Sequence, residues 1–149
     1  MTEIYVGKGD FDLKAYEWAG MAKKLDQMIS AKISERDKIR ALAVSTVGSL
    51  DGMPRSEGER DRVGNLAVKL ISAEEELDEL IDEYINCKNE ITELFEKLPA
   101  RYYGVLHRYY IRGMTVEAIA DELHYSARQV ARIKRAAIRE LEFLLEERN

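Results

Sequence analysis

Between Val63 and Leu98, apolar side chains recur at alternating steps of three and four residues. This spacing is typical of a helix that packs one face along another helix, so it predicts one long helix in a hairpin or coiled coil. A second apolar row beside it widens the face and indicates more than one packing neighbour. The main row is Val63, Leu66, Leu70, Ala73, Leu77, Leu80, Tyr84, Cys87, Ile91, Leu94 and Leu98; the second is Ile71, Ile81, Ile85 and Phe95.

A less regular apolar stripe predicts an earlier helix from about Asp10 to Ser45, with Asp10 or Asp12 as its N-cap. Residues 46–63 hold several glycines, Pro54 and few large apolar side chains, which predicts a flexible linker. We therefore expect residues 1–98 to form a helical hairpin or coiled coil that oligomerises. The pattern leaves open whether the hairpin closes within one chain. The stripe is Trp18, Met21, Leu25, Met28, Ile39 and Leu42, with Ile29 and Ile33 beside it.

The last fifty residues predict three shorter helices, which we assign to a second domain over residues 99–149. Pro99 interrupts the long helix, and a helix over 100–112 is expected to end at Gly113. Thr115 can cap the next helix, "VEAIADEL", in which Ile119, Ala120 and Leu123 point inward. Ser126 and Gln129 form a predicted capping box for a third helix, from Ala127 to about Glu146. Its expected inner face is Val130, Ile133, Ala137, Leu141 and Leu144.

Charge separates the two predicted domains. The chain has 28 acidic and 23 basic residues, a net charge of −5. Residues 1–98 carry a net charge of −7, whereas residues 101–139 carry +5. We interpret the acidic side chains of the long helix as a solvated surface. The basic segment "LHYSARQVARIKR" therefore needs its own explanation.

A short helix, a tight turn and a longer capped helix are the parts of a helix-turn-helix, in which the second helix reads base edges in the major groove. The alternative is a plain three-helix bundle whose last helix happens to be basic. Under the first interpretation, Ala127, Arg128, Gln129 and Arg132 face the bases. Lys134, Arg135 and Arg139 neutralise phosphates, Arg112 and Tyr125 touch the DNA backbone, and the capping residues Thr115 and Ser126 complete the interface.

The segment "RYYIRGMTVEAIADELHYSARQVARIKRAAIREL" resembles region four of bacterial sigma factors, the promoter-reading domain. Over roughly residues 40–145, the chain also resembles phage and prophage regulators of the RinA and ArpU kind. That resemblance rests on "LDGMPRSEGERDRVGN", "LISAEEELDELIDEYINCKNEI" and "RYY…IADELHYSARQV". It implies an all-α fold, a long helical region followed by a sigma-like helix-turn-helix, and control of late phage gene transcription.

His124 departs from this pattern, because related sequences usually have glycine at the turn between the two helices. The position often requires a positive φ, which histidine tolerates at some cost. We therefore predict a mildly strained turn at His124.

The sequence contains no motif that indicates a metal site, a catalytic centre or a bound cofactor. Two histidines and one cysteine offer no metal-site spacing, and no nucleophile or dinucleotide motif is present. We thus expect no enzyme activity, no cofactor and no metal. We interpret His107 as structural and Cys87 as a core residue. Without a signal peptide or an apolar span, a cytoplasmic location and no membrane partner are expected.

The sequence thus predicts a sequence-specific DNA-binding transcriptional regulator of phage origin that dimerises through its long helices. Double-stranded DNA is the expected partner, and RNA polymerase is a further candidate. Two alternatives stay open. One is a DNA-packaging subunit similar to a small terminase, and the other is an interaction module that binds polymerase without DNA.

Overall fold

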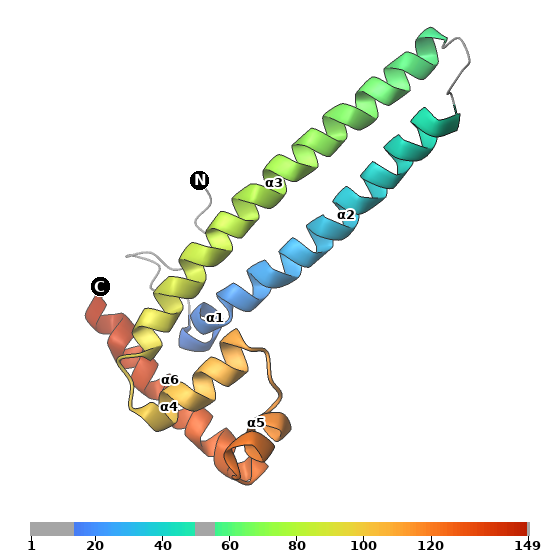
Figure 1. The fold of residues 1–149 in the computed structure, drawn as a ribbon. Helices are drawn as coiled ribbons and strands as arrows, with labels where there is room; N and C mark the ends of the chain where they lie inside the picture. Colours follow the sequence, from blue (N-terminus) through green and yellow to red (C-terminus); the bar gives the residue numbers. More distant parts are fainter. Residues whose placement is uncertain (1–13, 50–55, 149) are drawn as a thin grey trace. The chain divides into compact units, whose positions relative to one another are not determined.

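The computed structural model describes residues 14–49 and 56–148, and every regular element in them is a helix (Figure 1). This confirms the predicted all-α fold. The elements in chain order are α1 (Ala15–Ala19), α2 (Met21–Ser49), α3 (Glu57–Phe95), α4 (Ala100–Leu106), the π-helix η1 (His107–Ile111), α5 (Val116–Leu123) and α6 (Ala127–Arg148).

The chain divides into two compact units. Within the described ranges, unit 1 consists of residues 14–25 and 83–148, and unit 2 of residues 26–49 and 56–82. This division differs from the boundary that we expected after residue 98. The last turns of α3 carry buried side chains, including Cys87, Ile91 and Phe95, and these belong to unit 1. The end of α3 is therefore part of the core of unit 1.

In unit 2, the parts of α2 and α3 run antiparallel and are joined by ion pairs within the chain. Lys32 Nζ lies 2.5 Å from a carboxylate oxygen of Glu76, and Arg40 Nη2 lies 3.2 Å from one of Glu74. The hydrogen bond raises the pKa of Lys32 and lowers the pKa of Glu76. Because Lys32 is also 3.2 Å from Glu35, its charge is shared between two carboxylates.

The predicted linker over 46–63 was wrong at both ends. α2 continues to Ser49, and α3 already begins at Glu57; residues between 50 and 55 lie outside the described part, as do the candidate caps Asp10 and Asp12. A capping box starts α3: the Glu59 amide donates to Ser56 Oγ (3.2 Å), and the Ser56 amide donates to the Glu59 carboxylate (3.1 Å). These bonds satisfy the backbone amides of Ser56 and Glu59, which have no partner within the helix, and so they stabilise the start of α3 in a glycine-rich segment.

The main apolar row of α3 faces inward along its whole length, since none of its members is exposed. The second row is different. Phe95 is fully buried, whereas Ile71, Ile81 and Ile85 are exposed. The earlier stripe also divides, because Trp18 and Leu25 are fully buried while Met28 and Leu42 are exposed. The pattern therefore predicted the buried face of α3 well and overestimated its width.

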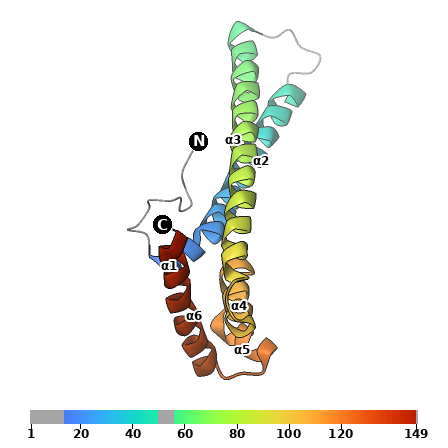
Figure 2. The same cartoon turned by 90° about the vertical axis from the view of Figure 1, so that its left-hand side faces the viewer.

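Unit 1 is built around α6, which packs against α1, α4 and α5 (Figure 2). Pro99 precedes α4, as expected from its inability to continue a helix. The predicted helix over 100–112 is α4 followed by a π-helical turn, in which the Arg112 amide donates to the His107 carbonyl at 3.0 Å. Gly113 follows with a φ of +69°, which confirms its predicted left-handed conformation.

Candidate nucleic-acid interface

Thr115 starts α5 as predicted. Its Oγ1 accepts a hydrogen bond from the Ala118 amide at 3.1 Å, which satisfies one of the free amides of the first turn. Ile119 and Ala120 are buried, and Leu123 is half-buried, so the expected inner face of this helix is confirmed. α5 is thereby anchored at its start and along one side.

His124 ends α5 in the left-handed conformation, with φ of 61° and ψ of 40°. It is the only non-glycine residue with positive φ in residues 14–49 and 56–148, so the predicted positive φ at this turn is confirmed. The Tyr125 amide donates to the Ala120 carbonyl at 2.9 Å and closes the turn. The side chain of His124 is exposed, so its role here is a backbone one.

Ser126 then starts α6. Its Oγ accepts a hydrogen bond from the Gln129 amide at 3.1 Å, as predicted for a capping box. The second bond of a capping box, between the Gln129 side chain and the Ser126 amide, does not form, so only one of the two bonds is present. Gln129 therefore presents its amide group to solvent. Its neighbours Tyr125, Ala127 and Arg128 are also exposed.

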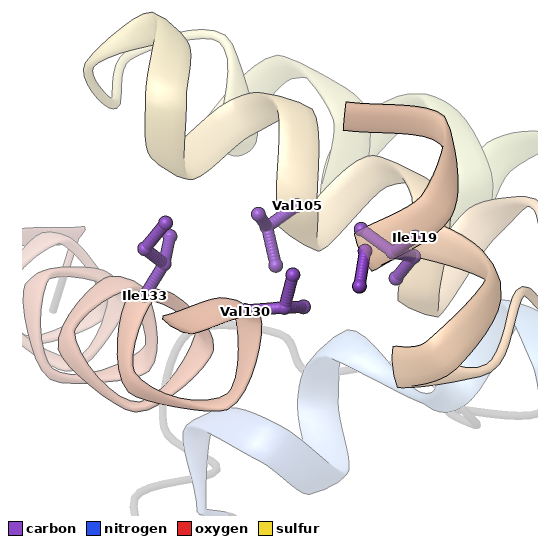
Figure 3. Packing of buried hydrophobic residues seen from close by; sticks show 5 residues of the cluster. Val105, Ile119, Val130 and Ile133 are labelled. Atoms are coloured by element: carbon purple, nitrogen blue, oxygen red, sulfur yellow. The ribbon is translucent and has the colours of Figure 1, made fainter. Parts of the chain in front are cut away.

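A small apolar core holds α5 and α6 together where they cross (Figure 3). Val105 of α4, Ile119 of α5 and Val130 of α6 are fully buried and face the same space. Ala120 lies in this cluster at 5% exposure, and its short side chain suits a place where helices pack closely. The core therefore fixes the direction in which the first turns of α6 present their outer face.

Four arginines form one row on that outer face. Arg128, Arg132, Arg135 and Arg139 are all exposed, and their spacing of four, three and four residues places them on one side of the helix. The buried side chains Val130, Ile133, Ala137 and Leu141 occupy the opposite side. No acidic residue occurs between Leu123 and Arg139. The row, which we call the arginine face, is therefore strongly positive over three turns.

Lys134 lies away from this face. Its ammonium is 3.8 Å from the centre of the Tyr109 ring, and the residue is half-buried. A cation over an aromatic ring is held by the negative ring face. The sequence placed Lys134 with the phosphate contacts, whereas in the structure it packs against η1.

Arg112, another predicted site residue, belongs to an ion-pair cluster that sequence reasoning missed. Its Nη1 is 3.1 Å from the Glu122 carboxylate, which also accepts a hydrogen bond from Arg108 Nε. Arg108 Nη1 donates to the Gly104 carbonyl at 2.9 Å. Both arginines lower the pKa of Glu122, the nearer hydrogen bond from Arg108 contributing most. The cluster connects α4 and η1 to α5. The positive charge of Arg112 is therefore partly neutralised by Glu122 within the protein.

Burial disfavours the charged forms of His107 and Cys87, two further reactive side chains in the unit. His107 stacks on Tyr103 at 5.3 Å, and burial together with nearby cations lowers its pKa. Cys87 is fully buried, which raises the pKa of its thiol to about 12. No group of three potential metal ligands occurs in the described ranges. These observations agree with structural roles for both residues.

Replacing His124 by glycine is expected to stabilise the protein by up to about 1 kcal/mol, because glycine adopts positive φ without a Cβ clash. His124→Ala should instead leave the stability unchanged or lower it, since alanine keeps the Cβ. Urea unfolding of both variants, followed by circular dichroism, measures the difference. A glycine variant less stable than wild type would show that the turn is not strained.

The fold and this geometry define the chain as an all-α protein that presents a basic, acid-free helix face above a small three-helix core. Among the helices of the described ranges, none has both the length and the apolar character that a bilayer crossing requires. The chain belongs to the family described as Protein of unknown function (DUF1492), which it matches over residues 47–142. That match includes α3, α5 and most of α6. No curated protein and no solved structure matches the chain.

Proposed function

We propose that α5, the turn at His124 and α6 form a helix-turn-helix that binds double-stranded DNA, with α6 in the major groove. The observation that carries this proposal is the arginine face, which lies opposite the core and includes the exposed first turns of a capped helix. In this kind of unit, outward residues near the start of the second helix contact base edges.

The positions on α6 support a division of labour between bases and phosphates. Arg128, Gln129 and Arg132 lie in the first turns, where arginine can bind guanine and glutamine can bind adenine through two hydrogen bonds each. Arg135 and Arg139 continue the same row further from the turn and suit phosphate oxygens. Tyr125, at 36% exposure beside the turn, is placed for a backbone contact.

We further propose that the protein is a transcriptional regulator of phage or prophage origin that acts as a dimer in the cytoplasm. The resemblance to RinA- and ArpU-type regulators supports the biological role. Unit 2 supports the dimer, because it exposes large apolar side chains on both helices. These are Leu42 (58%), Val44 (67%), Val68 (66%) and Ile71 (58%). Apolar area of this kind commonly marks a contact with another chain.

Selection of binding sites from random duplex DNA tests the proposal, with the mass in solution measured in parallel. We expect a defined sequence motif and the mass of a dimer. Recovery of no motif, together with retention on RNA polymerase, would replace the proposal by a polymerase-binding module. A ring of eight or more subunits would favour DNA packaging instead.

A further inference from the structure

A cavity of about 480 Å³ in unit 1 lies between α1, η1 and α6. It is separate from the base-reading turns of α6, since neither Arg128 nor Arg132 lines it. Its volume is within the range of pockets that hold small organic ligands, which is about 300–1,000 Å³. Its lining combines aromatic rings on one side with cations on the other.

Three tyrosines form the aromatic side. Tyr109 and Tyr110 pack edge to face, with ring centres 4.8 Å apart, and Tyr16 of α1 is half-exposed at 51%. Burial raises the pKa of Tyr110 to about 12, so its hydroxyl keeps its proton at neutral pH and remains a hydrogen-bond donor. Rings on adjoining helices, one of them accessible, are suited to stack against a planar ligand.

Three cations from α6 form the other side. Lys134 lies against the Tyr109 ring, and Arg135 and Arg139 are exposed. Glu142 is the single acidic residue in the lining, so the site has an excess of positive charge. Arginine binds phosphate oxygens through paired hydrogen bonds, and lysine acts as a point charge beside them.

We propose that this cavity binds a free small molecule in which a planar ring is joined to a phosphate, with a nucleoside monophosphate as the matching chemistry. The ring stacks on Tyr16, the exposed tyrosine of the lining, and the phosphate is held by Arg135 and Arg139. Glu142 accepts a hydrogen bond from the ring or sugar. A phosphate without a ring uses only half of the site, and a nucleoside without a phosphate uses only the other half.

Binding at this site opposes binding of DNA, because Arg135 and Arg139 belong to both the cavity and the arginine face. A ligand that occupies these two guanidinium groups removes them from the phosphates of a duplex. Coupling of this kind is reciprocal, so DNA lowers the affinity for the ligand by the same factor. This consequence rests on the proposed function, whereas ligand binding to the free protein does not.

Calorimetric titration of the DNA-free protein with AMP and GMP tests the site, with adenosine and inorganic phosphate as part-ligands. We expect a nucleotide to bind at least about tenfold more tightly than either part, and Tyr16→Ala to weaken it about tenfold. Arg139→Gln should weaken it similarly. Phe143→Ala is the matched aromatic control, because Phe143 is 60% exposed on α6 and does not line the cavity. It should leave nucleotide binding unchanged.

Arg128→Ala separates this site from the DNA interface, since it is expected to lose specific DNA binding and keep nucleotide binding. Glu142→Gln should strengthen the binding of inorganic phosphate, because it removes the only negative charge of the lining. Nucleotide binding no tighter than that of inorganic phosphate would overturn the proposal, as would equal binding by wild type, Tyr16→Ala and Arg139→Gln. Nucleotide binding as expected, without any DNA binding, would overturn the proposed function alone.

Discussion

Arg128→Ala and Arg132→Ala are each expected to weaken binding to the selected DNA site by about 1–3 kcal/mol. Both side chains are exposed on the first turns of α6 and make no ion pair in the described part of the protein. Their removal therefore costs contacts to DNA without leaving an internal partner unpaired. Fluorescence anisotropy with the selected duplex and with a scrambled duplex measures the loss of specific and of non-specific affinity separately.

Arg62→Ala provides the control for a lost positive charge. Arg62 is exposed on α3 in unit 2, outside the proposed interface. It should change the affinity for either duplex by far less than Arg128→Ala does. If Arg128→Ala and Arg132→Ala bind the selected site as wild type does, the assignment of α6 as the recognition helix is wrong.

Ile119→Ala is expected to lower the free energy of unfolding by about 2–5 kcal/mol. Ile119 is fully buried where α4, α5 and α6 meet, so its truncation loses apolar burial and leaves a cavity. Domains are commonly stable by only about 5–15 kcal/mol, so this is a large fraction of the total. Trp18, the single tryptophan, is fully buried in unit 1, and its fluorescence during urea unfolding reports this unit.

Ile85→Ala removes the same atoms from a side chain that is 48% exposed in the same unit. A surface truncation of this kind usually changes stability by less than about 0.5 kcal/mol. Equal losses for the two variants would mean that the core in Figure 3 does not hold α5 against α6.

Local signals were read correctly from the sequence because each depends on residues close together in the chain. The Thr115 and Ser126 caps and the positive φ of Gly113 follow from residue types within one turn. The left-handed conformation of His124 was predicted from the glycine that related sequences have at this position. The capping box at Ser56 was equally local, since serine followed three residues later by glutamate is its signature. The glycines around it hid that signal and suggested a linker.

Features made by tertiary contacts could not be predicted in this way. Arg108 and Glu122 are far apart in sequence, and nothing in the local pattern pairs them. The contact of Lys134 with Tyr109 joins two helices, and the periodicity of one helix does not predict such a contact. The inclusion of the end of α3 in unit 1 likewise depends on packing between distant segments. A regular apolar row predicts that a face is buried and does not identify what covers it.

The salt dependence of duplex binding tests the central claim, that the arginine face of α6 binds DNA, most directly. We predict that the logarithm of the binding constant falls linearly with the logarithm of the salt concentration, with a slope of about −0.9 for each phosphate contacted. Arg135→Ala combined with Arg139→Ala should make the slope shallower by about 1.8, because two phosphate contacts are lost. Binding that does not respond to salt, or a slope that is the same in wild type and the double variant, would contradict the account.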